Sequence, residues 1–445
     1  MGLRERITDV ADQPVPGHVD LVADYRRKLL AEVDLAELST FSAPQRRARL
    51  ERVLSRTLSR EGPVLSTYER SRLIRRVVDE ALGLGVLEPL LEDPTITEIM
   101  VNGPDVIFVE RSGRLERVEA RFPSVDQLYQ TIDRIVSAVN RRVDESSPMV
   151  DARLPTGERV NVIVPPLSLS GPAMTIRRFP RPYSIDELVA LGAIDVPLAG
   201  LLAAFVRARL NIIVSGGTGS GKTTMLNALS AFIPARERIV TIEDAAELSL
   251  QQEHVIRLES RPPNIEGRGQ VTIRDLMRNS LRMRPDRIIV GEVRGGETLD
   301  MLQAMSTGHE GSLATVHANS AEDAVMRLET LASMSELQIP FEALRDQINS
   351  AVDAIVFLAR GSDGVRRITE VAAVTSARRE AFQLTTLADF DQEPVGPDRT
   401  VQGHFRHLPL PAALAERLLR AGERVPPGFP SLPGEHRSFP RREPR

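Results

Sequence analysis

The stretch of sequence that decides the fold is Gly216-Gly217-Thr218-Gly219-Ser220-Gly221-Lys222-Thr223-Thr224. It follows an apolar strand pattern, Asn211 to Val214, and precedes a helical pattern. Glycines in such a loop let the backbone turn its N–H groups inward, and the N-terminus of the following helix attracts phosphate. We therefore predict that this loop binds nucleotide, with Lys222 on the β- and γ-phosphates and the Thr223 hydroxyl on Mg²⁺.

Lysine is rare in this chain, which singles out Lys222. Of 57 basic residues only Lys28 and Lys222 are lysines, and the rest are arginines. A compact ammonium suits this position where a forked guanidinium would not fit. The alternative is a glycine-rich turn without a ligand, but strand, spacing and helix together favour the phosphate loop.

Length and composition limit the class of protein. A chain of 445 residues is long enough for roughly two or three domains, and 42% hydrophobic residues can bury their cores. The net charge of -4 provides no general attraction to nucleic acid or anionic lipid. The absence of cysteine excludes disulfides and thiolate metal sites and is compatible with a reducing cytoplasm.

No segment has the pattern of a membrane anchor. Met1 to Pro16 carry charges and no apolar core of the kind that a signal peptide requires. The longest apolar stretches, Leu198 to Val206 and Val352 to Ala359, are much shorter than the roughly 20 residues that cross a bilayer. We therefore expect a cytoplasmic location, with membrane association that is peripheral or through a partner.

The sequence pattern changes several times along the chain. Leucine and arginine at helical spacing predict a partly mobile helical region over residues 1–75, and short strands with one long helix predict an α+β domain over 76–180. Proline residues indicate a linker over 181–194. Alternating strands and helices predict an α/β domain with a parallel sheet over 195–375, followed by a partly disordered extension over 376–445.

The individual elements of the α+β domain can be read from their apolar pattern. Strands are expected at Glu98 to Val101 and Val106 to Val109, then a helix at Val125 to Val139, then strands at Arg159 to Val164 and Ala173 to Arg177. In the extension after residue 375 only one helix is expected, over Ala412 to Ala421, with little order after Pro426.

Two acidic residues end strands that follow the phosphate loop. Glu243 closes Thr241-Ile242-Glu243-Asp244, and Glu292 follows the apolar strand Arg287 to Val290. Carboxylates at the carboxyl edge of a parallel sheet lie near bound phosphates, where they position a water or hold magnesium. Either acid alone could equally be a solvated strand end.

A run rich in glycine and serine, Thr307 to Asn319, contains His309 and His317. A histidine here can hydrogen-bond the γ-phosphate or its water and sense their loss, and we favour His317 over His309 for this role. Zinc is disfavoured, because the chain has no cysteine and no second ligand pair at zinc spacing.

Arginines of the α+β domain are candidates for stabilising the charge that develops during phosphoryl transfer. The candidates are Arg153, Arg159, Arg177 and Arg178. Most arginines in so arginine-rich a chain are ordinary surface charges.

The motifs together carry a resemblance to a known family. The loop at 216–224, the segment Thr241–Asp244, the strand end Val290–Arg294 and the run Gly308–Asn319 occur in the order of type II/IV secretion ATPases. They resemble that superfamily's Walker A, Asp, Walker B and His boxes.

Three further segments resemble the CpaF-like ATPases of tight-adherence (Flp) pilus assembly. They are Glu98–Pro104, Arg142–Pro155 and Thr175–Phe179. The likeness covers roughly residues 70 to 375, whereas the tail after Gly428 matches no known pattern.

The resemblance implies a RecA-like P-loop ATPase domain that hydrolyses ATP with Mg²⁺. It further implies a homo-hexamer whose ATP lies between the α+β and RecA-like domains. Such a ring, at the inner face of the membrane, drives pilus assembly or protein secretion through an inner-membrane platform protein.

The resemblance also assigns roles to individual residues. Glu243 serves as base or water-positioner and Glu292 as the acid on the magnesium side, although the base can be either. Arg159 and Arg178 face the phosphates, with Arg153 and Arg177 behind them.

Three alternative functions are compatible with parts of this pattern. A conjugation or DNA-uptake ATPase has the same fold and need not contact DNA. A nucleic-acid translocase is disfavoured, because aromatic residues make up only 4% of the chain and tryptophan is absent, so direct contact with nucleic acid is not expected. A scaffold that binds nucleotide without hydrolysing it is disfavoured by the presence of both acids and His317.

Overall fold

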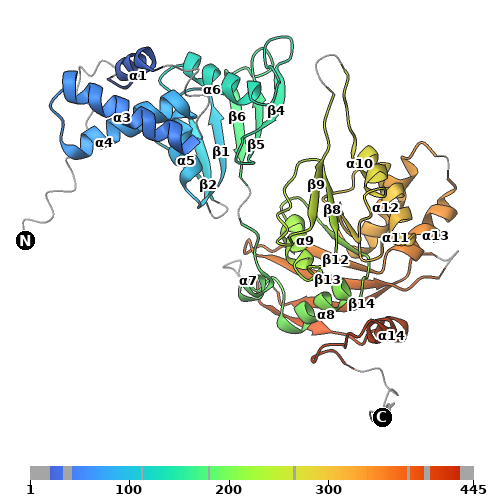
Figure 1. Ribbon diagram of the computed structural model, residues 1–445. Coiled ribbons are helices and arrows are strands. Elements are labelled where there is room, and N and C mark those ends of the chain that lie inside the picture. Colours follow the sequence, from blue (N-terminus) through green and yellow to red (C-terminus); the bar gives the residue numbers. More distant parts are fainter. Residues whose placement is uncertain are drawn as a thin grey trace, which may run out of the picture. The chain divides into compact units, whose positions relative to one another are not determined.

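A computed structural model describes residues 21–33, 43–111, 114–178, 181–263, 267–337, 339–377, 381–394 and 401–430. The chain divides into two compact units, Met1–Pro180 and Arg181–Arg445 (Figure 1). None of the described helices is long and apolar enough to cross a membrane.

The first unit begins with packed helices. They are α1 (Leu21–Glu32), α3 (Ala43–Glu61) and α4 (Thr67–Leu82). Tyr25, Leu29, Leu54 and Val77 share one buried cluster, so the leucine periodicity of this region does mark a core face. A capping box between Ser66 and Glu69 starts α4. Residues 1–20 lie outside the described part of the chain.

The rest of the first unit is an antiparallel sheet covered by a helix. Among its described residues, six strands pair in the order β3-β2-β1-β6-β5-β4. They are β1 (Ile96–Asn102), β2 (Ile107–Arg111), β3 (Arg114–Val118), β4 (Met149–Arg153), β5 (Arg159–Ile163) and β6 (Ala173–Arg177). Helix α6 (Val125–Ser137) packs Leu128 and Ile132 against this sheet, and the turn η1 (Gly85–Leu87) and α5 (Glu88–Glu92) lead into it. The expected strands and helix are confirmed here.

The second unit is built on a mixed sheet. Among the described residues of this unit, nine strands pair in the order β15-β14-β13-β12-β7-β11-β10-β8-β9. Strands β12, β7, β11, β10, β8 and β9 pair with one another in parallel. On the other side of β12, strands β13, β14 and β15 continue the sheet by antiparallel pairing. Their bounds are β7 Ile212–Gly216, β8 Ile239–Glu243, β9 Val255–Glu259, β10 Arg287–Val290, β11 Leu313–His317, β12 Ala354–Arg360, β13 Arg366–Val374, β14 Leu384–Gln392 and β15 Gly403–His407.

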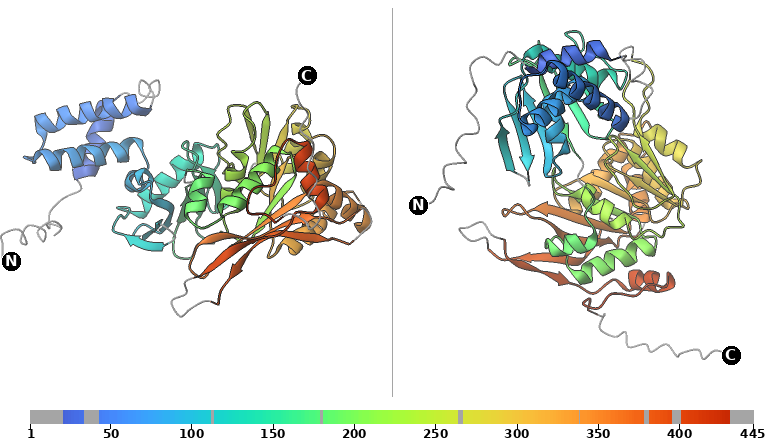
Figure 2. Two further views of the ribbon diagram at one scale, coloured as in Figure 1. Left: turned by 90° about the horizontal axis from the view of Figure 1, so that it is seen from below. Right: turned by 60° about the vertical axis from the view of Figure 1, so that its left-hand side comes forward.

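Helices cover both faces of this sheet (Figures 1 and 2). Alternate residues of β7 point to opposite faces, so Ile212 and Val214 join one apolar cluster and Ile213 joins the other. The first cluster packs α7 (Ile185–Ala190), α8 (Val196–Arg207), α9 (Lys222–Ser230) and α14 (Ala412–Arg420). The second packs α10 (Ile273–Ser280), α11 (Glu297–Ser306), α12 (Ala321–Ser333) and α13 (Phe341–Ala351).

The part of the chain after residue 375 contains more regular structure than the single helix that the sequence predicts. Helix α14 is confirmed, and β14 and β15 in addition extend the sheet by antiparallel pairing. The Arg207 guanidinium donates two bonds of 2.8 Å to Glu423. His407 Nε2 lies 3.0 Å from Asp195 Oδ2. These contacts attach the extension to both ends of α8.

A buried ion pair lies near the start of β10. Arg287 is fully buried, and its Nε donates to Glu237 Oε2 at 2.6 Å. Its Nη1 donates to the Gly311 carbonyl at 2.9 Å. A Cβ on Gly311 would lie 1.9 Å from that nitrogen, so this glycine of the histidine-containing run makes room for Arg287.

Glu237→Gln should lower the free energy of unfolding by about 3 kcal/mol, because it leaves the buried Arg287 charge without its carboxylate. The matched control is Glu416→Gln, which breaks an exposed pair with Arg420 and should cost less than about 0.5 kcal/mol. Urea denaturation of the full chain measures both. Equal effects of the two variants would contradict the predicted role of the buried pair.

Candidate nucleotide site

The loop predicted to bind phosphate joins β7 to α9. Gly216 ends β7 with φ at +151°, and a Cβ there would lie 2.3 Å from the Leu358 carbonyl oxygen. Glycine is therefore required for this close approach. Gly221, at φ +99°, is the N-cap of α9 and provides no side-chain cap for the first-turn N–H groups. Such N–H groups at a helix N-terminus are available to a phosphate.

The remaining loop residues fall into two groups. Gly217, Thr218 and Gly219 are exposed, whereas Lys222, Thr223 and Thr224 form the first turn of α9. The Ser220 hydroxyl is buried and has no hydrogen-bond partner among the described residues. An unsatisfied buried hydroxyl beside exposed glycines fits a loop whose polar groups are completed by a bound ligand.

Lys222 is buried within this loop. Its Nζ donates to the carbonyl oxygens of Gly216 at 3.0 Å and Gly217 at 2.9 Å. Burial lowers the pKa of Lys222, and Glu292 opposes that effect. The ammonium is therefore held directly over the loop, where its charge is only weakly solvated.

His317 and Glu292 lie beside Lys222. His317 ends β11, where parallel pairing places it opposite Gly216 of β7. Both ring nitrogens of His317 lie 3.4 Å from Lys222 Nζ, and its Nε2 lies 2.6 Å from Glu292 Oε1. Burial lowers the pKa of His317; the carboxylate of Glu292 counteracts this, and Lys222 and Arg294 add to it. His309 precedes β11 and does not belong to this cluster.

Arg294 and Asp244 join the same cluster, in roles that their sequence motifs alone do not reveal. Arg294 Nε donates to Glu292 Oε2 at 2.6 Å, and its Nη2 contacts the same oxygen. Arg294 Nη1 lies 3.4 Å from Asp244 Oδ2. Both residues belong to the motifs described above: Asp244 directly follows Glu243, and Arg294 lies two residues after Glu292. Their pairing joins the loops after β8 and β10.

Glu243 is placed differently from Glu292. It is buried at the end of β8, and its Oε2 accepts the N–H groups of Glu247 at 2.7 Å and Leu248 at 2.8 Å. Its Oε1 is buried without a hydrogen-bond partner among the described residues. Burial raises the pKa of Glu243 to about 7, against the effect of the two N–H bonds. A carboxyl group with this pKa can exchange a proton near neutral pH.

The candidate arginines belong to the first unit, and their predicted contact with phosphates stays a prediction. Arg178 Nη1 donates to the Ile96 carbonyl at 3.0 Å and contacts the Asp93 carbonyl. Arg159 Nη2 lies 3.7 Å from Asp151 Oδ1. Arg178 therefore also holds the start of β1 within its own unit.

The predicted magnesium ligands are Thr223 and Glu292. The described residues contain no group of three or more histidine, cysteine or acidic residues that could hold a metal by themselves. Magnesium in nucleotide sites takes most of its ligands from phosphate and water, so the assignment of Thr223 and Glu292 stays a prediction. The hydroxyl and the carboxylate fit such an ion.

Stability should depend on pH through Glu243. The folded state holds the Glu243 proton more tightly than the unfolded state, whose pKa is the ordinary 4.5, so unfolding releases a proton between these values. Stability from this residue is therefore lost as pH rises from about 4.5 to 7. Glu243→Gln should remove that loss. The free energy of unfolding of the variant, measured relative to wild type, should therefore rise by up to about 3 kcal/mol between pH 5 and pH 8.

Urea denaturation of both proteins at pH 5 and pH 8 checks this prediction. Glu253→Gln, at an exposed position, controls for the removal of one negative charge. The same difference between Glu243→Gln and wild type at both pH values would be inconsistent with a perturbed Glu243.

Comparisons with known proteins agree with this fold. Residues 80–388 match the family described as type II/IV secretion system protein. A putative conjugal transfer protein of Mycobacterium tuberculosis is 40% identical over 320 residues, which cover 70% of this chain and 90% of that protein. The conjugal transfer protein TrbB of Rhizobium radiobacter is 35% identical over 328 residues, covering 72% of this chain and 96% of that protein.

A solved structure is also similar. The pilus retraction motor PilT with bound ADP aligns with 66% of this chain and 84% of its own, with a TM-score of 0.50 and 21% identity. At this identity the similarity concerns the fold, and it agrees with the expected α/β fold with a RecA-like P-loop domain. Since the family match extends over residues 80–388, well over half of the chain, the protein belongs to the type II/IV secretion system protein family.

Proposed function

We propose that this protein is a motor that hydrolyses ATP to drive pilus assembly or protein secretion across the inner membrane. The observation that carries the proposal is the cluster at the carboxyl edge of the sheet. There the imidazole of His317 lies within hydrogen-bonding distance of both the loop ammonium of Lys222 and the carboxylate of Glu292. A cation and an acid beside a phosphate loop are recurring parts of sites that transfer phosphoryl groups, and a histidine there can respond to the charge of the phosphate.

In this proposal the loop 216–224 holds the triphosphate of ATP. Its N–H groups and Lys222 bind the phosphates, and Thr223 with Glu292 holds Mg²⁺, which neutralises charge on the phosphate oxygens. The present bonds of Lys222 to the Gly216 and Gly217 carbonyls keep its ammonium at the loop. The loop is thus arranged for phosphate before the ligand binds.

The two acids take different roles. Glu292 belongs to the cluster and pairs with His317 and Arg294, so it is suited to hold magnesium or orient the attacking water. Glu243 is suited to accept a proton, because its pKa lies near 7. Arg294 positions Glu292 by neutralising one of its oxygens, and His317 responds to the charge on both Glu292 and Lys222.

Contacts between copies of the chain complete the motor in this proposal. Arg159 and Arg178 face the phosphates from the α+β domain, and the chain works as a homo-hexamer bound peripherally to the cytoplasmic side of the membrane through a platform protein. The resemblance to CpaF-like ATPases of Flp pilus assembly, carried by residues 98–104, 142–155 and 175–179, supports a pilus as the product. Direct contact with nucleic acid is not part of the proposal.

A second candidate is the ATPase of a conjugation system. The similarity to conjugal transfer proteins of Mycobacterium tuberculosis and Rhizobium radiobacter favours it. The same ATP chemistry would then serve a type IV secretion channel. Neighbouring genes discriminate between the two, since small pilins point to a pilus and a relaxase to conjugation. A scaffold that binds nucleotide without hydrolysing it is the third candidate.

Lys222→Ala should abolish ATP binding, whereas Glu292→Gln should keep binding and lose phosphate release by about 100-fold or more. Fluorescent ATP analogues measure binding and a phosphate-release assay measures turnover. Lys28→Ala is the matched control, because Lys28 is the only other lysine and lies on α1 in an exposed pair with Asp24. Wild-type turnover in Glu292→Gln would exclude its role, and no turnover in wild type would favour the scaffold.

The purified chain should form hexamers, and a non-hydrolysable ATP analogue should increase their fraction, because the predicted site needs arginines from the α+β domain beside the phosphates. Light scattering after gel filtration, with and without the analogue, measures the mass. A strict monomer at high concentration in both conditions would argue against a ring motor.

A further inference from the structure

The hairpin formed by β12 and β13 lies beside the phosphate loop. Leu358 of β12 pairs with Gly216 of β7 in parallel, so the residues after Leu358 continue in the direction in which β7 enters the loop. The chain then turns back, and β13 begins at Arg366, which pairs with Arg360 of β12. The start of β13 therefore lies at the same edge of the sheet as the loop.

The Arg366 side chain lies against the N-terminus of α9. A Cβ on Gly221, the N-cap of this helix, would lie 3.4 Å from Cδ of Arg366 and 3.8 Å from its Cβ. Arg366 is nevertheless exposed as a whole. Its aliphatic stem is thus placed at the end of α9 where backbone N–H groups are available to a phosphate.

The other charged side chains around the turn of this hairpin have partners. Arg360 Nε donates to the Gly364 carbonyl at 3.3 Å. Arg367 donates to both carboxylate oxygens of Asp363, at 3.1 and 2.7 Å. The acid of the turn is therefore occupied by Arg367. Arg366 itself forms no hydrogen bond or ion pair among the described residues.

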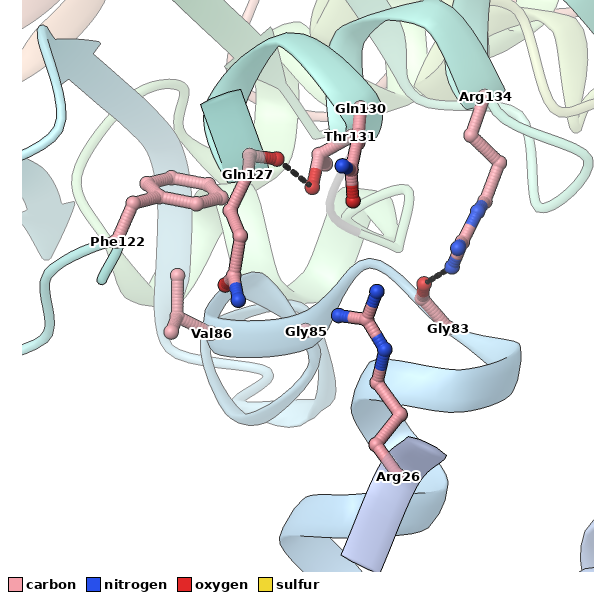
Figure 3. Close-up of a pocket in the computed structure, with 9 residues that line it drawn as sticks. All are labelled: Arg26, Gly83, Gly85, Val86, Phe122, Gln127, Gln130, Thr131 and Arg134. Carbon is pink, nitrogen blue, oxygen red and sulfur yellow. Dashed lines mark hydrogen bonds between the residues drawn. The ribbon is translucent and has the colours of Figure 1, made fainter. Parts of the chain in front are cut away.

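Arginines beside glycines elsewhere in this protein hold the backbone of a turn. Arg134 of α6 donates to the Gly83 carbonyl in the first unit (Figure 3). Arg261 Nε donates to the Gly269 carbonyl at 2.7 Å in the second unit. The Arg366 guanidinium lies beside a glycine-rich loop but binds no carbonyl among the described residues, so holding the loop does not explain its position.

The strand order separates Arg366 from the cluster around Glu292. Strands β11 and β10 lie on one side of β7, whereas β12 and β13 lie on the other. His317 ends β11 and Glu292 follows β10, so both lie on the side of the loop away from Arg366. The groups that the proposed function assigns to the γ-phosphate and its magnesium are therefore not the ones that Arg366 would contact.

We propose that Arg366 binds the α- and β-phosphates of the nucleotide, the part that hydrolysis leaves in place as ADP. This inference rests on the proposed function, which supplies ATP as the ligand. In a phosphate loop the backbone N–H groups cradle these two phosphates, and Arg366 adds the paired N–H donors of a guanidinium at the same helix N-terminus. Arg366 and the loop belong to one unit, Arg181–Arg445, so the contact requires no second copy of the chain.

Calorimetric titration of the full chain with ADP and with a non-hydrolysable ATP analogue tests this role. Arg366→Gln should raise the Kd for both ligands by about tenfold or more, because a charge-assisted bond to a phosphate that both ligands carry is lost. The ratio of the two Kd values should stay as in wild type. In a phosphate-release assay KM should rise by a similar factor, while kcat should stay within about twofold of wild type.

Arg360→Gln is the matched control, because it removes an exposed arginine from the position that pairs with Arg366, and it should bind both ligands as wild type does. Urea denaturation checks that both variants fold. Wild-type Kd values in Arg366→Gln, or an equal loss in the two variants, would overturn the role of Arg366 and leave the proposed function intact. A loss for the ATP analogue alone would place Arg366 at the γ-phosphate and would also overturn it. If the wild-type chain binds neither ligand, the proposed function itself fails, and this inference fails with it.

Discussion

The close approach of Gly216 to the neighbouring strands is the constraint on which the site depends. Parallel pairing with β11 sets Gly216 opposite His317, and pairing with β12 sets it opposite Leu358, whose carbonyl leaves no room for a Cβ. This register brings the ends of β7, β11, β10 and β8 to one edge. The phosphate loop, His317 and Glu292, which are far apart in the sequence, thereby lie together.

The charges at that edge depend on one another. Lys222 is buried and donates to two loop carbonyls. His317 contacts both Lys222 and Glu292. Arg294 neutralises Glu292 from the opposite side and extends the network to Asp244. Because each group shifts the electrostatic balance of the next, an added phosphate changes all of them together. Glu243 stays outside this network, behind Gly291 and bonded to its own loop.

Local sequence patterns predict most of the fold. The phosphate loop has a characteristic spacing. Strands β8, β10 and β11 are mostly apolar and are closed or closely followed by an acid or a histidine, so their carboxyl ends could be grouped on one edge. Arg294 could not be assigned, because its importance lies in a contact across strands. Strands β14 and β15 could not be predicted from the sequence, because Thr, Asp and His interrupt their apolar pattern at the antiparallel edge of the sheet.

The C-terminal extension is tied to the same strand that carries the phosphate loop. Arg417 of α14 contacts Asp353, and Asp353 Oδ2 accepts the N–H of Asn211, the residue that leads into β7. The Asn211 side chain in turn holds the backbone of Met305, Ala351, Gly311 and Ser312. Burial raises the pKa of Asp353, and Arg417 counteracts this, so loss of α14 would leave a poorly solvated acid at the start of β7. The family match ends at residue 388, before α14, yet this helix is part of the support of the family's central strand.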